Sequence, residues 1–375
     1  MKFEKYPFEK LNELLKGITP KEKDEINLTI GEPQFETPSF IKDEIIENID
    51  LIKKYPKSSG EKYLKEALIK YNKERFGIQL EEDEIIPTFG TREVLFNFPQ
   101  FLLYNISSPH MAFTNPFYQI YEGAAIASKA KITYINLEEE NGFKPVISED
   151  KLKEIDFVIL NFPNNPTAST LDINELRWWV SASREYDFYL LNDECYIDLY
   201  FDEKIPSLLE ASILEGNRDF KKIFVVNSAS KRSSAPGLRS GYIAGDKEVL
   251  KSYMRYRTYI GCASPLMLQK GAAAAWEDLK HPKEFVEVYK RNFDLAKEIL
   301  KITPPKATFY IWLRVKDDLE FTKRVYEEYN IKVLPGRFLG RDGIGEGFIR
   351  IALVYRPEII EIALKKIKRV IDEEY

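Results

Sequence analysis

Residues 223–242 read IFVVNSASKRSSAPGLRSGY, and this stretch decides the fold. It opens with an apolar run, residues 223–226, and then turns polar at Asn227, Ser228, Ser230 and Lys231. A short run that is apolar at every position and bounded by polar residues is typical of a parallel strand buried on both faces. Lys231 therefore follows closely on a predicted buried strand.

Two earlier runs have the same form. Residues 157–160 (FVIL) precede Asn161, and residues 188–191 (FYLL) precede Asn192 and Asp193. Between the two runs, Asp172 and Glu175 have the spacing of a capping box, which predicts a connecting helix. Strands that alternate with helices indicate βαβ units, so we expect an α/β fold with a mainly parallel central sheet sandwiched by helices.

The carboxyl ends of these strands define a candidate site. Ligands of open α/β sheets bind outside the carboxyl ends of the strands. Asn165, Asp193 and Lys231 each follow or end one of the three runs. The strand prediction therefore places these side chains at one crevice.

The length of the chain predicts two domains, because 375 residues exceed the usual size of one hydrophobic core. Downstream of the central runs, residues 308–313 and 348–354 have the pattern of strands, and a closing helix has Pro357 near its start. We predict a large domain over residues 50–265. Residues 1–49 and 266–375 are predicted to form a smaller α+β domain.

Composition excludes several classes of protein. With 55 basic and 60 acidic residues the net charge is −5, which disfavours nucleic-acid binding. No apolar run approaches the roughly 18 residues of a membrane span, and the charged start is unlike a signal peptide. We expect a soluble, cytoplasmic protein. The chain has only two cysteines and two histidines, which argues against a metal centre or a histidine triad.

Lys231 is the candidate nucleophile. Burial and nearby cations lower the pKa of a lysine and make its amine reactive toward carbonyls. Arg232 and Arg239 are close enough in sequence to act in this way, or equally to bind an anion. Ser228, Ser230 and Arg239 together have the donor types of a phosphate site. A solvated loop with ordinary basic residues is the alternative interpretation.

Other candidates are weaker when taken singly. Asp193 can hold a pyridine nitrogen protonated or simply end a turn. Gly90-Thr91-Arg92 precedes a helical pattern and can form an anion site or a plain N-cap. Tyr118 can stack on an aromatic ring or belong to the core. Arg350 interrupts an apolar strand, so it needs an anionic partner, either from a substrate or from the protein.

The order of these motifs is more specific than any one of them. Pro-Asn-Asn-Pro-Thr (163–167), Asp-x-x-Tyr (193–196) and Ser-x-Ser-Lys (228–231), with an arginine eight residues further on, resemble the class I/II aminotransferases of fold type I. The resemblance spans roughly residues 28–355 and implies that pyridoxal 5'-phosphate is the cofactor.

The resemblance also implies roles for individual residues. Lys231 matches the lysine that forms the Schiff base and shuttles the proton, and Asp193 matches the partner of the pyridine nitrogen. Asn165 and Tyr196 match the pair that bonds the phenolic oxygen, and Tyr118 the stacking aromatic. The implied phosphate cradle comprises Gly90, Thr91, Arg92, Ser228 and Arg239. Arg350 matches the clamp on the substrate α-carboxylate, and Gly31 lies in the N-terminal substrate loop. Tyr55 resembles the tyrosine that reaches the partner subunit's phosphate, which implies a homodimer.

Within the family, three segments resemble the bacterial succinyldiaminopimelate aminotransferases: residues 228–246, 256–265 and 334–341. Aspartate aminotransferases bind a side-chain carboxylate with an arginine at a position occupied here near Tyr259. Arg257 and Arg232 are then candidates for a more distant carboxylate, such as a succinyl group. The expected reaction is amino transfer between glutamate/2-oxoglutarate and N-succinyl-LL-2,6-diaminopimelate in lysine biosynthesis.

Two alternatives stay open, and a third is disfavoured. The substrate can be another amino acid, such as aspartate, an aromatic amino acid or an acetylated diamino acid. The same fold can also serve a β-lyase, since fold does not determine reaction. A cofactor-binding transcriptional regulator would carry a DNA-binding domain, and the chain has no basic helix-turn-helix pattern.

Overall fold

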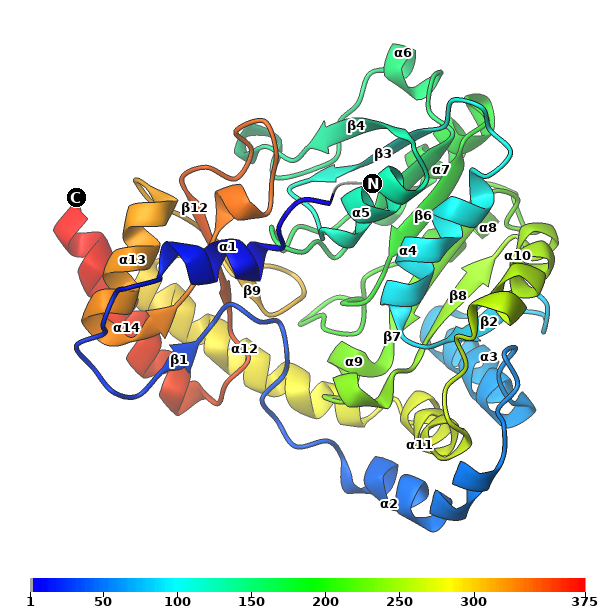
Figure 1. The fold of residues 1–375 in the computed structure, drawn as a ribbon, viewed down its shortest axis with the longest axis horizontal. Helices are drawn as coiled ribbons and strands as arrows, with labels where there is room; N and C mark the ends of the chain where they lie inside the picture. Colours follow the sequence, from blue (N-terminus) through cyan, green and yellow to red (C-terminus); the bar gives the residue numbers. More distant parts are fainter. Residues whose placement is uncertain (1–2, 375) are drawn as a thin grey trace.

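The computed structural model describes residues 3–374, which form a large and a small α/β part side by side (Figure 1). The large part contains a seven-stranded sheet. Its strands, in spatial order, are β2 (Ile85–Thr88), β8 (Gly241–Gly245), β7 (Ile223–Ser228), β6 (Tyr189–Asp193), β5 (Phe157–Leu160), β3 (His110–Asn115) and β4 (Lys131–Asn136). Strands β7, β6, β5, β3 and β4 run parallel, and β8 pairs antiparallel with β7 and β2. The predicted mainly parallel sheet is therefore confirmed.

The three predicted strands are present, and two of them extend beyond their apolar runs. Strand β5 has the predicted bounds, whereas β6 continues to Asp193 and β7 to Ser228. Asp193 pairs with Val226, and Ser228 pairs with Gly241 of the antiparallel neighbour β8. Backbone pairing, rather than hydrophobicity, thus determines where these strands end.

Alternate residues of each central strand are buried in two different cores. Val158 and Leu160 of β5 share one core, while Phe157 and Ile159 share the other. The first core is covered by α3 (Lys62–Phe76), α7 (Ile173–Glu185), α8 (Leu208–Leu214) and α11 (Leu266–Glu277). The second is covered by α4 (Thr91–Leu102), α5 (Ile120–Ala127) and α10 (Lys247–Ile260). Burial on both faces explains why these strands are apolar at every position.

The helix that connects β5 to β6 begins where the sequence predicts. The Asp172 side chain accepts hydrogen bonds from the backbone of Asn174 and Glu175, and the Glu175 carboxylate accepts from the Asp172 backbone. This reciprocal cap satisfies amides that the first turn of a helix leaves unpaired. A shorter helix, α6 (Glu149–Leu152), precedes β5.

The small part is built on a three-stranded antiparallel sheet. Its order is β11 (Leu334–Pro335), β12 (Phe348–Ala352) and β9 (Tyr310–Arg314). Helices α13 (Asp318–Tyr329) and α14 (Pro357–Glu374) cover it, and β1 (Ile26–Asn27) pairs in parallel with β10 (Ile331–Lys332). The N-terminal helix α1 (Pro7–Leu14) also packs here, through Leu11 against Leu334 and Leu339.

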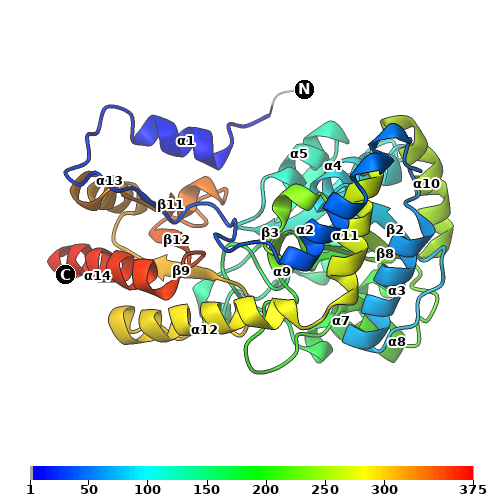
Figure 2. The same ribbon diagram turned by 90° about the horizontal axis from the view of Figure 1, so that it is seen from below.

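The packing of α2 (Ser39–Glu47) and α11 does not match the predicted domain boundaries. Both were predicted in the small domain, yet Ile41 of α2 and Ala272 of α11 are buried in the same core as α3. Figure 2 shows the two helices side by side on the large part. A Cβ atom on Gly271 would lie only 2.7 Å from the Ile45 side chain. The small residues of α11 permit this close approach, which the hydrophobic pattern does not reveal.

Helix α12 (His281–Leu300) links the two parts. His281 at its start bonds Ser233 of the large part, while Phe293 and Ala296 lie in the core of the small part. Figure 2 shows the helix running between the two parts. Within residues 3–374, no helix is both long and apolar enough to cross a membrane.

Candidate active site

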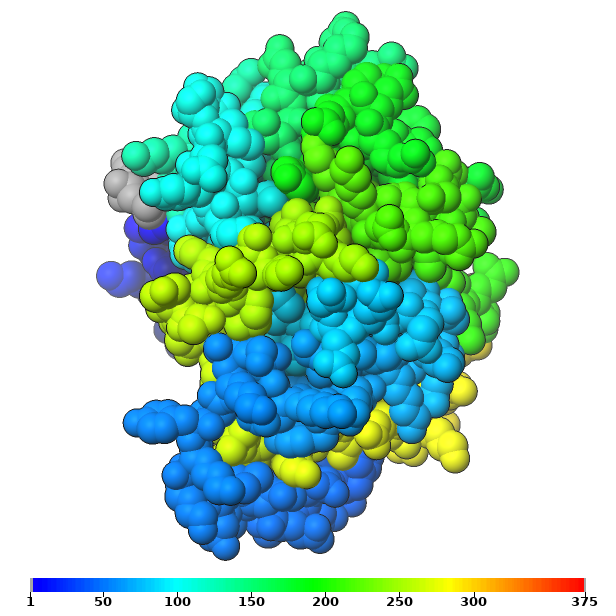
Figure 3. All heavy atoms as spheres, turned by 90° about the vertical axis from the view of Figure 1, so that its right-hand side faces the viewer, coloured from blue at the N-terminus to red at the C-terminus, as the bar shows by residue number. Residues whose placement is uncertain are grey.

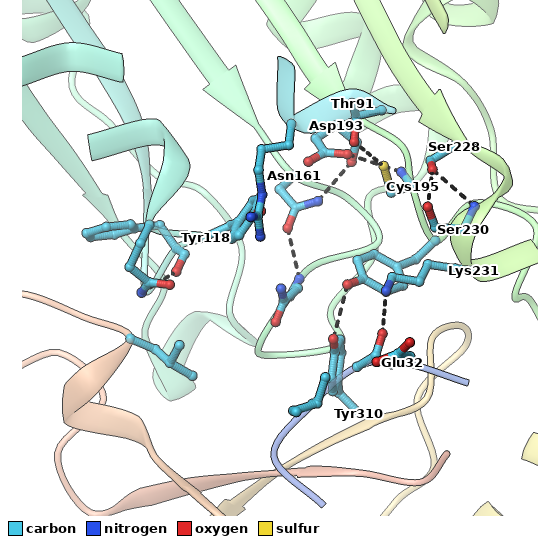
Figure 4. A pocket seen from close by; sticks show the side chains of 18 of the residues that line it. Glu32, Thr91, Tyr118, Asn161, Asp193, Cys195, Ser228, Ser230, Lys231 and Tyr310 are labelled. Carbon is cyan, nitrogen blue, oxygen red and sulfur yellow. Dashed lines mark hydrogen bonds between the residues drawn. The ribbon is translucent and has the colours of Figure 1, made fainter. Parts of the chain in front are cut away.

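A pocket of about 490 Å³ lies between the large and small parts (Figure 4). Asp193 and Ser228 end β6 and β7, Asn161 follows β5, and Lys231 lies in the short helix α9 (Ala229–Arg232). Tyr310 and Arg350 enter from the small part. The volume is in the ordinary range for small-molecule sites. The structure thus brings Asn165, Asp193 and Lys231 to one pocket.

The position of Lys231 is set by the end of β7. The Ser228 side chain caps α9 by accepting a hydrogen bond from the Ser230 amide at 3.1 Å. Lys231 then points into the pocket, where its amine donates to the backbone carbonyl of Gly31. Burial lowers the pKa of the Lys231 amine to about 8, and the positive charges of Arg350 and Arg239 act in the same direction. The folded protein therefore carries neutral Lys231 amine at pH values where an ordinary lysine stays protonated, and a nucleophile or general base requires the neutral form.

Asp193 is a buried carboxylate on the floor of the pocket. It accepts hydrogen bonds from the Tyr121 hydroxyl at 2.8 Å and from the Cys195 amide at 3.2 Å. Burial raises the pKa of Asp193, although these hydrogen bonds and the charge of Lys231 oppose the shift. A cationic ligand group beside Asp193 would stabilise its charged form.

Several groups with the chemistry to bind an anion lie at the start of α4 and after the end of β7. Arg239 adopts a left-handed backbone conformation with φ of 50° and donates to the carbonyls of Pro236 and Phe89 at 2.8 and 3.3 Å. Gly90 leaves room for this guanidinium, because a Cβ atom there would lie 2.4 Å from an Arg239 nitrogen. Thr91, Ser228, Ser230 and Arg239 all line the pocket. Hydroxyl groups, helix-start amides and a guanidinium together suit a phosphate.

Arg350 and Asn165 join the two parts of the molecule across the pocket. Arg350 is 4% exposed and donates to the Asn165 side-chain oxygen at 2.6 Å and to the carbonyl of Thr29. Its Nε atom is buried and has no partner within residues 3–374. A buried guanidinium without a carboxylate partner is costly, so the site is suited to a ligand carboxylate.

Tyr310 is a pocket residue that sequence reasoning missed. Its hydroxyl lies 3.1 Å from that of Tyr196, and the Arg350 guanidinium lies 4.5 Å from its ring centre. Gly31 has no room for a side chain, because a Cβ atom would lie 1.8 Å from the Tyr310 hydroxyl. The predicted strand 308–313 contains Tyr310, but only tertiary packing identifies it as part of the site.

Tyr118 and Arg92 form a pair at one side of the pocket. The Arg92 Nε atom donates to the Tyr118 hydroxyl at 2.7 Å, and its guanidinium lies 5.8 Å from the ring centre. Tyr6 and Phe8 from the N-terminal segment line the same pocket. The sequence contains no local signal for this contribution, because it depends on how the N-terminal segment packs.

Two predicted substrate residues lie outside the pocket. Arg232 is 1% exposed and donates to the Asp198 carboxylate at 2.7 Å. Arg257 is also 1% exposed and donates to the Glu93 carboxylate at 2.8 Å. Neither lines the pocket. The Arg257 guanidinium is paired with the buried Glu93 carboxylate, and Arg232 shares the buried Asp198 carboxylate with Arg75. The geometry therefore does not support our prediction that they bind a substrate carboxylate.

Tyr55 also lies outside the pocket, and its side chain is 100% exposed. A fully exposed tyrosine cannot contact a phosphate in its own subunit. Its predicted role depends on a second copy of the chain.

The comparison with known families agrees with this geometry. Residues 23–367 match the family model described as aminotransferase class I and II. This match covers most of the chain, and the protein belongs to the class I and II aminotransferases. Enzymes of this family depend on pyridoxal 5'-phosphate.

Individual relatives agree with one another on the family but differ in substrate. The aminotransferase AspB from Helicobacter pylori has 47% identity and a TM-score of 0.97, with 99% of this chain and 100% of that one covered. The LL-diaminopimelate aminotransferase of Natranaerobius thermophilus is 29% identical, with 96% of each chain covered. The aspartate aminotransferase of Pyrococcus horikoshii is 28% identical, with 97% of this chain and 95% of that one covered.

The pocket residues fit this cofactor. Asp193 offers a buried carboxylate for a cationic ring nitrogen, and Lys231 offers an amine with a lowered pKa. The absence of a side chain at Gly90 keeps the Arg239 guanidinium in place beside hydroxyl donors. Each of the chemical requirements of the cofactor is thus met by a group that lines or borders the pocket.

Proposed function

We propose that this aminotransferase moves an amino group between glutamate/2-oxoglutarate and N-succinyl-LL-2,6-diaminopimelate, in lysine biosynthesis. The convergence of Lys231, Asp193, Arg239 and Arg350 on one pocket is the observation that carries the proposed transamination. Relatives named for LL-diaminopimelate support a substrate of this kind. A relative named for aspartate is nearly as similar, so aspartate is the second candidate substrate.

We assign the cofactor contacts as follows. Asp193 would hold the ring nitrogen, Tyr118 would stack on the ring, and Asn165 and Tyr196 would bond its phenolic oxygen. Gly90, Thr91, Ser228, Ser230 and Arg239 would hold the phosphate. When bound, pyridoxal 5'-phosphate delocalises the electron pair that is released at the substrate α-carbon.

The residues of the chain supply binding and proton transfer. Arg350 binds the substrate α-carboxylate, and its bond to Asn165 fixes the guanidinium between the two parts of the molecule. The neutral Lys231 amine would take the proton from the substrate α-carbon and return a proton to the exocyclic carbon of the cofactor. General base action of this type contributes roughly 10²–10⁴-fold. The lowered pKa of Lys231 supports this role.

We also propose that the enzyme works as a homodimer with shared active sites. Tyr55 is 100% exposed, Tyr259 is 92% exposed and Ile52 is 71% exposed. Chain segments that contain these residues lie on the face drawn in Figure 3. Large exposed side chains of this type are typical of interfaces.

The proposed homodimer is tested by sedimentation of the holoenzyme, which should give the mass of two chains. Tyr55→Ala should weaken cofactor binding. A monomeric protein whose cofactor affinity is unchanged by Tyr55→Ala contradicts the proposal.

The reaction is tested by mixing the holoenzyme with glutamate and measuring the release of 2-oxoglutarate. Without an oxo-acid acceptor, each active site should release one molecule of 2-oxoglutarate. With an acceptor, release should continue over many turnovers. A β-lyase would instead release ammonia from a β-substituted amino acid and leave glutamate unchanged. Lys231→Ala should lose nearly all turnover and the visible absorbance of the lysine-bound cofactor. Retained turnover in that variant would refute the assignment of Lys231.

The identity of the acceptor is tested separately. Comparison of kcat/KM for the oxo acids of succinylated diaminopimelate, diaminopimelate and aspartate ranks the candidates directly. We expect the succinylated compound to rank first. If oxaloacetate ranks first, aspartate replaces the diaminopimelate derivative as the substrate.

A further inference from the structure

Four cationic side chains line the pocket: Arg92, Lys231, Arg239 and Arg350. The proposed reaction uses three of them, for proton transfer, for the phosphate and for the α-carboxylate. Arg92 has no such role, and it makes no ion pair with a carboxylate in the part of the chain from residue 3 to residue 374. A cation that lines a pocket without a protein counter-charge is available to an anionic ligand.

The hydrogen bonds of Arg92 leave its outer edge available. Only its Nε atom is engaged, by the Tyr118 hydroxyl at 2.7 Å. This contact fixes the plane of the guanidinium beside the tyrosine ring. The two terminal nitrogens make no hydrogen bond to residues 3–374. A guanidinium that is held by one nitrogen and presents the other two is arranged for a planar carboxylate.

The surroundings of Arg92 favour such a contact. Tyr6 lies beside Tyr118, and Phe8, Ile30, Leu334 and Leu339 line the same pocket. Arg92 itself is exposed to solvent, so a ligand that enters the pocket can reach its guanidinium, and the apolar side chains offer no competing charge. The only carboxylates among the lining residues are Glu32 and Asp193, and neither bonds Arg92.

We propose that Arg92, held in place by Tyr118, binds the second carboxylate of a dicarboxylic amino or oxo acid. This inference rests on the proposed transamination. It assigns to Arg92 the distal contact that we had predicted for Arg232 and Arg257, and it removes Arg92 from the predicted phosphate cradle. The preferred substrates of the site are then amino acids with a second acidic group at the end of the side chain.

The test compares two amino donors that differ only in the distal carboxylate. Glutamate and norvaline have the same five-carbon chain, and norvaline lacks the second acid. The rate at which the holoenzyme reacts with each donor, measured without an oxo-acid acceptor, gives kcat/KM for the first half-reaction. We expect Arg92→Gln to lower the glutamate-to-norvaline ratio by about 10- to 100-fold, because one charge-assisted contact is lost. Arg92→Lys should recover part of that ratio.

A second variant and a surface control complete the experiment. Tyr118→Phe keeps the ring but frees Arg92, so it should lower the same ratio by a smaller factor. Arg218→Gln removes an exposed arginine outside the pocket and should leave the ratio unchanged. The visible spectrum and the cofactor Kd of each variant show whether the site is intact.

Two outcomes would overturn the proposal. If Arg92→Gln weakens cofactor binding and lowers kcat/KM equally for both donors, Arg92 belongs to the phosphate cradle. If the ratio does not change, Arg92 does not contact the substrate. Failure of the proposed function has a different signature, because the wild-type enzyme would then convert neither donor.

Discussion

The Arg350 guanidinium donates a hydrogen bond of 2.6 Å to the side-chain oxygen of Asn165, and this bond joins the small part of the molecule to a pocket-lining loop of the large part. Arg350 lies in β12, and Asn165 lies in the loop that follows β5. The two predicted binding residues, 185 positions apart in the chain, are thus one connected unit.

Substitution of Arg350 should therefore affect substrate binding. Arg350→Gln removes the charge and the paired donors, so we expect kcat/KM for glutamate to fall by about 100-fold or more. Arg314→Gln is the matched control, because Arg314 lies in the adjacent strand β9 and is exposed to solvent. Steady-state kinetics measure kcat/KM for glutamate in both variants. If kcat/KM for glutamate falls equally in the two variants, the loss does not come from a contact between Arg350 and the substrate.

The lowered pKa of Lys231 predicts a pH-dependent stability of the cofactor-free protein. The pKa of Lys231 is about 8 in the folded protein and 10.5 for an ordinary lysine. At pH values between these two, Lys231 is mostly protonated in the unfolded chain and mostly neutral in the folded chain. Stability therefore rises with pH across this window, because the unfolded state binds more protons.

Urea unfolding of the cofactor-free protein from pH 7.5 to 10.5 measures this effect. Lys231→Met removes the titrating amine while keeping an unbranched side chain of similar length. The difference in unfolding free energy, wild type minus variant, should increase as pH rises through about 8. A flat difference would show that the folded and unfolded amines titrate alike.

Gly90 should be required for the Arg239 contact. Gly90→Ala would bring a Cβ atom to 2.4 Å from an Arg239 nitrogen, and the backbone φ of 74° disfavours any side chain. We expect the Kd for pyridoxal 5'-phosphate to rise by about 10-fold, the cost of one displaced charge-assisted bond. Gly142→Ala is the control, since Gly142 has a φ of 65° with nothing within 4 Å of the added atom. If Gly90→Ala binds the cofactor as tightly as Gly142→Ala, Gly90 is not required for the Arg239 contact.

The central sheet could be predicted because its signal is local. Strand β5 consists of four apolar residues, and each contacts one of the two cores. Asp193 and Ser228 could be placed in the site because parallel strands end at the same edge of a sheet. Their roles as the last residues of β6 and β7 could not be predicted, since that depends on pairing with a neighbouring strand.

The ion-pair partners of Arg232 and Arg257 could not be predicted from the residues next to them in the sequence. The carboxylate of Asp198 lies 34 positions from Arg232, and that of Glu93 lies 164 positions from Arg257. An arginine near a motif can serve the ligand or the fold, and only tertiary structure reveals its partner. Tyr310 is the converse case, because an aromatic residue in a strand has no local feature that marks it as part of a site.

The structural role of Arg257 leads to a prediction about stability. Arg257→Ala would leave the Glu93 carboxylate buried without its partner and the carbonyls of Ser58 and Cys262 without a donor. We expect a loss of about 3–5 kcal/mol in unfolding free energy, as for other broken buried pairs. Adding Glu93→Gln should recover part of this loss, because coupled partners are not additive. Urea unfolding of the single and double variants measures the coupling. A stable Arg257→Ala protein with a raised KM for succinylated substrate would instead restore Arg257 as a substrate contact.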